Sequence, residues 1–337
     1  MESAGRAVAL VLARLFPEGP VVGVVGPGHN GGDALVALRS LRAWGREVAW
    51  VAAGGRAPDA ALLHGWEVPR LEPDGAPAAF ARAGAILDGI LGTGAAGAPR
   101  EPAASFIRLM NASGRPVVAL DIPSGVDPTT GRVAGEAVRA AVTVTLGWPK
   151  RGLLFYPGRG LCGRLVAVDI GFPPLAERPG AALITPQWAA ARLPVRPPDA
   201  HKGVAGRLLL LAGSVGMAGA AAIAARGATR AGAGLVRIAS VEANRPILQA
   251  LVPEAVFTDR DDGAALESAA GTAAAVVAGP GLGLDAGARA ALERALARTA
   301  GRPTLLDADA LTLFAAEGEP ALRRLARDRP LVLTPHP

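Results

Sequence analysis

The sequence predicts an α/β fold in two domains, the first built on a doubly wound parallel sheet. Three observations support this prediction. Short apolar runs alternate with helical stretches, a proline-rich stretch interrupts the pattern near the middle of the chain, and the 337 residues suffice for two domains of ordinary size.

The apolar runs of the first half are mostly continuous, as expected when helices cover both faces of a sheet. The strands predicted there are Val21–Val25, Glu47–Ala52, Ala85–Asp88, Pro116–Leu120, Ala141–Leu146 and Leu165–Val168. Helices are predicted between them, including Ala34–Trp44 and Pro102–Ala112. At the start of the chain Val8, Leu12 and Leu15 share one face at helical spacing, which predicts an amphipathic helix.

Prolines concentrate between Phe172 and Asp199, and this density opposes regular structure. We therefore expect a first domain at residues 1–175, a proline-rich connection at 176–199 and a second α/β domain at 200–337. The second domain is predicted to contain a helix at Ala218–Ala231 and strands at Arg207–Ala212, Leu235–Ala239, Val276–Ala278, Thr304–Leu306 and Leu331–Leu333. Because the sequence ends at a loop entry after a strand, we expect this domain to be incomplete.

The composition excludes several classes of protein. The net charge of +6 comes mostly from scattered arginines, without a basic run, so no nucleic-acid partner is expected, whereas an anionic small molecule suits the charge. Cys162 is the single cysteine, which rules out an internal disulfide and fits a reducing cytoplasm. No apolar run is long enough to cross a membrane, and the start is a poor signal peptide.

The strongest local signal is Gly26–Asp33, Gly-Pro-Gly-His-Asn-Gly-Gly-Asp, between a predicted strand and a predicted helix. Glycine permits positive φ and a close approach of backbone to ligand, and a helix N-terminus offers free N–H groups to an anion. The pattern matches neither the Rossmann fingerprint nor a Walker A loop. A tight turn with an aspartate cap is the alternative interpretation.

Two further polar segments follow predicted strands. Asp88 ends one strand and is followed by the glycine-rich stretch Gly92–Gly97, and Asp121 ends another, with Ser124 and Asp127 behind it. Each aspartate by itself is also typical of a loop cap. Because ligands collect at the carboxyl ends of parallel strands, we expect all these polar segments to converge on one site.

These residue types indicate acid/base chemistry and cation binding, but they do not identify a substrate. A carboxylate at the tip of an apolar strand, such as Asp121, is a candidate acid/base whose pKa the site can tune. Ser124, together with a carboxylate and a carbonyl, supplies the oxygen donors that a hard monovalent or divalent cation prefers.

Three segments in this order, GPGHNGGDALVALRSL, LDGILGTGAAG and ALDIPSGVD, closely resemble NAD(P)H-hydrate epimerase domains. The second half resembles the ADP-dependent NAD(P)H-hydrate dehydratases through HKGVAGRLLLLAGSVGMAGAAAIAARGATRAGAGLVRIA, VVAGPGLG, LDADAL and VLTPHP. Fused in this order, the halves resemble the bifunctional NAD(P)H-hydrate repair enzymes of bacteria. The resemblance implies a Rossmann-like first domain that epimerises the R and S hydrates of NADH and NADPH. It also implies a ribokinase-like second domain that belongs to the ADP-dependent dehydration of the S hydrate.

The resemblance also implies roles for single residues. Asn30, Asp88 and Ser124 are expected to hold a potassium ion, and Asp121 is expected to face the altered nicotinamide ring as the catalytic acid/base. Contacts to the hydrated dinucleotide are expected from His29, Asn30, Gly31, Gly32, Asp33, Gly92, Thr93, Gly94, Ala95, Ala96, Gly97, Ala98 and Asp121. The family usually has Asn where His29 stands, and because His also donates and accepts hydrogen bonds we expect function to survive.

In the second domain the resemblance places Gly281, His336 and Pro337 in the substrate wall. The complete dehydratase takes ADP and magnesium, in a nucleotide loop with a catalytic aspartate that lies beyond the segment where this sequence stops. We therefore expect no dehydratase activity from this polypeptide alone. The start also looks short for the family, and a homo-oligomer is expected.

Two other functions stay open at this stage. A ribokinase-like small-molecule phosphotransferase would need a downstream Gly-x-Gly-Asp anion loop. A non-catalytic dinucleotide-binding protein would not need Asp88, Asp121 and Ser124 together.

For Lys150 and Arg151, a solvated turn is favoured over a phosphate contact. Asp307 and Asp309 are expected to orient loops or touch substrate, and Cys162 is expected to be a buried small hydrophobe.

Overall fold

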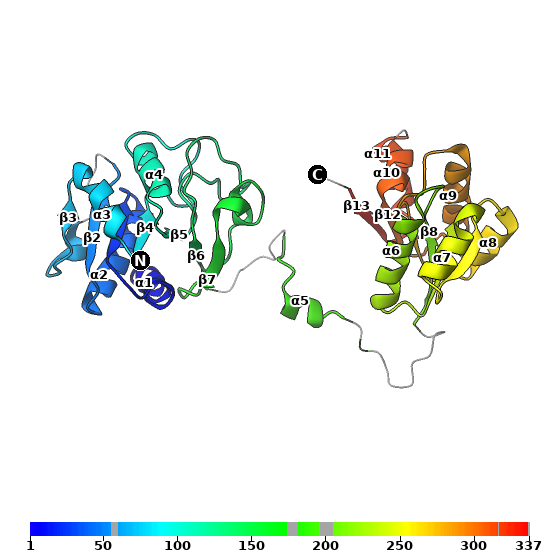
Figure 1. The fold of residues 1–337 in the computed structure, drawn as a ribbon, viewed down its shortest axis with the longest axis horizontal. Coiled ribbons are helices and arrows are strands. Elements are labelled where there is room, and N and C mark those ends of the chain that lie inside the picture. Colours follow the sequence, from blue (N-terminus) through cyan, green and yellow to red (C-terminus); the bar gives the residue numbers. More distant parts are fainter. Residues whose placement is uncertain (55–59, 174–180, 194, 196–204, 316, 336–337) are drawn as a thin grey trace. The chain divides into compact units, whose positions relative to one another are not determined.

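The computed structural model describes residues 1–54, 60–173, 181–193, 195, 205–315 and 317–335. The chain divides into two compact units, Met1–Ala182 and Leu183–Pro337, each with its own parallel sheet (Figure 1). No helix in the described part of the chain is long and apolar enough to cross a membrane.

The sheet of the first unit has the order β3-β2-β1-β4-β5-β6-β7. Its strands are β1 (Val21–Val25), β2 (Val48–Ala52), β3 (Arg70–Leu71), β4 (Ala85–Gly89), β5 (Val117–Leu120), β6 (Val142–Leu146) and β7 (Arg164–Val168). Its helices are α1 (Glu2–Leu15), α2 (His29–Ala43), α3 (Ala76–Arg82) and α4 (Ala103–Ala112), with short 3₁₀ turns η1 (Ala60–Leu63), η2 (Pro73–Gly75), η3 (Arg151–Leu153) and η4 (Gly158–Leu161). All neighbouring strands are parallel. The order reverses between β1 and β4, where open α/β sheets bind their ligands.

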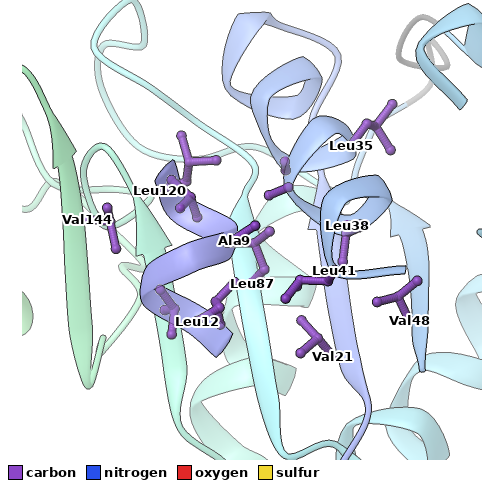
Figure 2. Close-up of a cluster of buried hydrophobic side chains, with 14 of the residues drawn as sticks. Ala9, Leu12, Val21, Leu35, Leu38, Leu41, Val48, Leu87, Leu120 and Val144 are labelled. Atoms are coloured by element: carbon purple, nitrogen blue, oxygen red, sulfur yellow. The ribbon is translucent and has the colours of Figure 1, made fainter. Parts of the chain in front are cut away.

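Helices cover both faces of this sheet because side chains alternate along each strand. On one face the strands pack against α1 and α2, where Leu12, Leu38 and Leu87 meet (Figure 2). On the other face Ile86 lies in a second cluster with Phe80 of α3 and Ile107 of α4. This doubly wound arrangement confirms the predicted fold class.

The second unit repeats the plan with the order β10-β9-β8-β11-β12-β13. Its strands are β8 (Arg207–Leu211), β9 (Leu235–Ser240), β10 (Val256–Asp259), β11 (Ala275–Ala278), β12 (Thr304–Asp307) and β13 (Leu331–Thr334). Its helices are α5 (Pro186–Ala190), α6 (Ala218–Arg230), α7 (Arg245–Leu251), α8 (Gly263–Gly271), α9 (Ala286–Arg298), α10 (Ala308–Ala315) and α11 (Glu319–Leu325), with the 3₁₀ turn η5 (Glu242–Asn244). The reversal here lies between β8 and β11, and the apolar strand residues again divide between two clusters.

One predicted boundary was wrong. The helix expected at Ala34–Trp44 begins at His29, so Asn30 lies in its first turn and Asp33 directly after that turn, rather than in a loop. The glycine pair that suggested a loop serves close packing instead. A Cβ on Gly31 would lie 1.8 Å from the carbonyl oxygen of Gly26.

The contribution of α1 to the first core can be tested with two leucines. Leu12 is fully buried and Leu10 is 56% exposed on the same helix. Leu12→Ala should lower the free energy of unfolding by about 2–5 kcal/mol, because it removes buried methyl groups and leaves a cavity. Leu10→Ala should change it by no more than about 0.5 kcal/mol. Urea unfolding measures both, and equal effects would contradict the packing of α1 on the sheet.

Candidate functional site

A cavity of about 470 Å³ opens at the carboxyl ends of the strands, where the order of the first sheet reverses. Loops after β1, β4, β5 and β6 supply its walls. The lining residues are Pro27, Gly28, His29, Asn30, Asp33, Ile90, Leu91, Gly92, Thr93, Gly94, Ala95, Asp121 and Leu146. The structure therefore brings together polar segments that lie up to ~90 residues apart in the chain, as the convergence of strand ends predicts.

Asp88 and Ser124 form a buried network beside this cavity, and neither is exposed. The Ser124 hydroxyl donates to Asp88 Oδ1 at 2.6 Å and its amide donates to Oδ2 at 2.9 Å. The Ser124 oxygen accepts from the Leu91 amide at 2.9 Å. These bonds join the loops that follow β4 and β5.

Asn30 extends the network to the loop after β1. Its side-chain amide donates to the carbonyl oxygen of Leu91 at 3.0 Å, and that oxygen lies 3.4 Å from the Ser124 hydroxyl. Asn30, Asp88, Ser124 and Leu91 are thus joined in one hydrogen-bonded network that contains carboxylate, hydroxyl and carbonyl oxygens. No group of three His, Cys, Asp or Glu side chains gathers in the residues that the structure describes. The donors here are of the kind that a hard cation prefers.

Burial raises the pKa of Asp88 from 3.8 to about 6, although the hydrogen bonds from Ser124 and the Ile90 amide act in the opposite direction. No Lys or Arg forms an ion pair with this carboxylate in the described chain. A buried carboxylate without a cation costs free energy when ionised. A bound cation would remove that cost, so the residues fit a cation site.

Asp121 follows β5 with a left-handed backbone, φ 69°, which is uncommon outside glycine. Its amide donates to the Val144 carbonyl on β6 at 2.8 Å, so the neighbouring strand holds this conformation. The residue is 7% exposed as part of the cavity wall, and Oδ1 accepts from the Leu146 amide at 3.0 Å. Such conformations cost about 1–3 kcal/mol and cluster at functional sites.

Lys150 is the partner that the sequence reasoning missed. The favoured interpretation of a solvated turn was wrong for this residue, because its ammonium group forms an ion pair with Asp121. It also donates to the Leu146 carbonyl at 2.8 Å and lies 3.3 Å from the Thr145 hydroxyl. The position of Lys150 in the sequence could have indicated this contact, because Lys150 follows β6 at the sheet edge where the predicted acids lie. Arg151 is exposed, and its Nε donates to the Thr129 carbonyl.

Asp33 is the second acid on the cavity wall. Burial raises its pKa from 3.8 to about 6, and the charge of Asp121 acts in the same direction. The amino group of Met1, 3.8 Å from Oδ1, and His29 oppose this rise. Asp33 does not cap α2, because the cap position is Gly28 and no side chain caps it. The alternative reading of this segment as an Asp-capped turn is therefore wrong.

The glycine-rich loop after β4 presents backbone to the cavity. The amides of Thr93, Gly94, Ala96 and Gly97 donate no hydrogen bond within the described part of the chain. A Cβ added at Gly94 or Gly97 would meet no atom within 4 Å, so the backbone is open on that side. Free amides in a loop of this kind suit an anion such as phosphate.

Some predicted contact residues lie away from this cavity. Gly31 and Gly32 are buried in the first turn of α2 and do not line it. Neither do Ala96, Gly97 and Ala98, although Gly97 lines a neighbouring hollow. Cys162 is fully buried, as predicted.

The second unit brings fewer predicted residues together. The loops after β8 and β11 meet at the reversal, where the Ser214 amide donates to the carbonyl of Gly281. Asp309 accepts from the Gly283 amide at 2.8 Å and so orients the loop after β11, whereas Asp307 accepts from the Thr334 hydroxyl at 2.7 Å and joins the ends of β12 and β13. His336 and Pro337 lie outside the described residues.

Comparison with known proteins adds two family matches. A family described as YjeF-related protein N-terminus matches residues 1–152, and a family described as NAD(P)H-hydrate dehydratase matches residues 208–337. A bifunctional NAD(P)H-hydrate repair enzyme of Pyrobaculum aerophilum is 38% identical over 100% of this chain and 69% of its own length. One of Coxiella burnetii is 36% identical over 99% of this chain and 68% of its own.

Two solved structures are similar to parts of the chain. An ADP/ATP-dependent NAD(P)H-hydrate dehydratase from Bacillus subtilis, co-crystallised with ATP and Mg²⁺, is 36% identical with a TM-score of 0.33, over 38% of this chain and 46% of its own. A yeast protein is 23% identical with a TM-score of 0.45, over 53% of this chain and 86% of its own.

The raised pKa of Asp33 predicts how stability depends on pH. The folded state holds the proton up to about pH 6 and the unfolded state only to about 3.8, so the free energy of unfolding should fall as pH rises between these values. The contribution of Asp33 to this fall is roughly 3 kcal/mol. Asp33→Asn should therefore make the decline shallower in urea titrations from pH 4 to 7.

Asp74→Asn is the matched control, because Asp74 is exposed in η2. A slope that Asp33→Asn leaves unchanged would contradict the effect of burial on this carboxyl group.

Proposed function

We propose that this chain, which belongs to the family of bifunctional NAD(P)H-hydrate repair enzymes, uses its first unit to interconvert the R and S hydrates of NADH and NADPH. The observation that carries the proposal is Asp121, a strained, ion-paired carboxylate on the wall of a cavity that also presents free loop amides. Catalytic carboxylates and free backbone amides of this kind are what epimerisation of a phosphorylated dinucleotide requires.

The chemistry starts from a hydroxyl on carbon 6 of the ring, beside the ring nitrogen. Water can leave and return on the other face, or the ring can open and close again. Asp121 lies on the cavity wall, and its ion pair with Lys150 holds the carboxylate there. We propose the ring-opening route, in which this carboxylate accepts the hydroxyl proton first.

In that route Asp121 takes the hydroxyl proton, and the bond from carbon 6 to the nitrogen breaks as the carbonyl forms. The nitrogen takes a proton from Asp121. After rotation of the free carbonyl, the nitrogen attacks its opposite face, and the protons return to where they began. Lys150 keeps the carboxylate in position through its contacts to Asp121 and Leu146.

The remaining cavity residues hold the substrate. The loop from Gly92 to Ala98 is proposed to supply amides for the phosphates, and within it Gly92, Thr93, Gly94 and Ala95 line the cavity. At the start of α2, His29, Asn30 and Asp33 line it, whereas Gly31 and Gly32 do not. A bound anion at this turn also meets the positive end of the helix dipole. We propose these residues as the dinucleotide contacts.

A potassium ion is proposed at Asn30, Asp88 and Ser124. Support comes from the buried carboxylate that has no ion-pair partner in the described chain and from the oxygens gathered around it. The ion would supply positive charge that fixes the three loops. Asn30 and Ser124 would offer neutral oxygens and Asp88 the negative charge.

The second unit belongs to the dehydratase family by its match over residues 208–337. For this half we propose the family's reaction, the ADP-dependent return of the S hydrate to NAD(P)H, with magnesium and nucleotide as in the relative co-crystallised with ATP and Mg²⁺. The prediction that this polypeptide alone lacks dehydratase activity stays untested. A homo-oligomer and a cytoplasmic location also stay predictions.

Asp121→Asn should lower kcat for epimerisation by about 10²–10⁴-fold, the usual contribution of one acid/base. Binding of NADPH, measured by calorimetry, should stay within a few-fold of the original chain. Chromatography of the R and S hydrates after incubation measures the rate. Lys150→Met should lower kcat as well, because it removes the ion pair, and unchanged turnover in both variants would overturn the assignment.

Potassium should raise the melting temperature of the chain and the rate of epimerisation relative to choline chloride at equal ionic strength. Asp88→Asn should abolish both responses, because it removes the buried charge that the ion neutralises. Asp74→Asn, in exposed η2, should retain them. A potassium response that survives in Asp88→Asn would place the ion elsewhere.

A further inference from the structure

A second hollow of about 280 Å³ lies beside the cavity in the first unit. It shares Leu91, Gly92 and Ala95 with the cavity, so the glycine-rich loop borders both. Its own wall comes from the segment after β5, including Ile122, Gly125, Val126, Asp127, Thr130, Arg132 and Ala134. The two hollows together fall in the range of about 300–1,000 Å³ that is typical of small-molecule sites.

The far wall of this hollow is built as a tight loop. The Asp127 amide donates to the Arg132 carbonyl at 2.9 Å, the Gly131 amide donates to the Asp127 carbonyl at 3.0 Å, and Val126 bridges to Val133. Gly131 has φ 72°, and a Cβ there would lie 2.6 Å from the carbonyl oxygen of Phe155. The backbone that carries Arg132 is therefore fixed by hydrogen bonds and packing.

Arg132 carries the one positive charge among the residues that line the hollow. It is exposed, and no carboxylate of the described chain forms an ion pair with it. Asp127 also lines the hollow and interacts with Arg132 by charge without an ion pair, while its Oδ1 accepts from the amides of Thr129 and Thr130 and from the Thr130 hydroxyl. The arginine is thus available to an anion in the hollow.

The order of the chemical groups along a dinucleotide matches the order of the cavity, the loop amides and the second hollow. The ring end belongs in the cavity with Asp121, and the pyrophosphate belongs on the loop amides between the two hollows. The adenosine half then reaches the second hollow, with its ribose toward the wall that carries Arg132. A guanidinium binds phosphate in a bidentate manner, and an arginine near the ribose is a common means of accepting a 2′-phosphate.

We propose that the second hollow is a subsite for the adenosine half of the dinucleotide, in which Arg132 binds the 2′-phosphate that distinguishes the NADPH hydrate from the NADH hydrate. The inference rests on the proposed function for the identity of the substrate. It adds a binding site and a residue that selects between two substrates.

The test uses calorimetric titration of the full chain with adenosine 2′,5′-bisphosphate and with adenosine 5′-monophosphate. Arg132→Ala should weaken bisphosphate binding by about tenfold or more and change monophosphate binding by less than about twofold. Arg132→Lys, which keeps the charge, should retain most of the affinity for the bisphosphate. Arg139→Ala is the matched control, because Arg139 is also exposed in the first unit and does not line the hollow.

Loss of bisphosphate affinity in Arg132→Ala alone supports the proposal. Equal losses for the two ligands, no loss, an equal loss in Arg139→Ala, or no binding of the bisphosphate by the original chain would overturn it. Failure of this inference and failure of the proposed function give different results. A chain that epimerises both hydrates but binds the bisphosphate without Arg132 refutes only the subsite. A chain that binds the bisphosphate through Arg132 but does not epimerise refutes only the proposed reaction.

Discussion

The geometry of the site in the first unit depends on the buried carboxylate of Asp88. A carboxylate in this position must be satisfied by hydrogen bonds, and Ser124 supplies two of them. Since Ser124 also accepts from Leu91, and Leu91 accepts from Asn30, the loops after β1, β4 and β5 are tied through one group. The proposed cation site lies in the network that joins these loops, so a cation bound there would couple ion binding to loop order.

Two acids on the same cavity wall differ because their surroundings differ. Asp121 forms an ion pair with Lys150, whereas Asp33 has the Met1 amino group 3.8 Å away and burial raises its pKa to about 6. Pairs of carboxylates in unlike environments commonly divide the roles of base and acid. The proposed reaction needs a base at the ring, and we assign this role to Asp121, the carboxylate that Lys150 holds on the cavity wall.

The sequence predicted the strands of the sheet in the first unit well, except for the short edge strand β3, because buried parallel strands are continuous apolar runs. It also predicted that Asn30, Asp88, Asp121 and Ser124 would converge, because polar residues at strand ends share one edge. The sequence did not predict contacts that the spacing of residues along the chain cannot indicate. The backbone of Gly31 in α2 packs against Gly26, and Lys150 forms an ion pair with Asp121. Both contacts appear only in the folded chain.

Both units use the same reversal of strand order, yet their loops present different chemistry. At the first reversal lie the carboxylates of Asp88 near the end of β4, Asp121 directly after β5 and Asp33 in α2. At the second, the backbones of Ser214 and Gly281 contact each other, and Asp309 is used to hold the Gly283 amide. A common scaffold thus places loops at equivalent positions, and the side chains on those loops decide whether the site performs acid/base chemistry. We therefore propose the acid/base reaction for the first unit on the basis of its own residues, independently of what the second unit does.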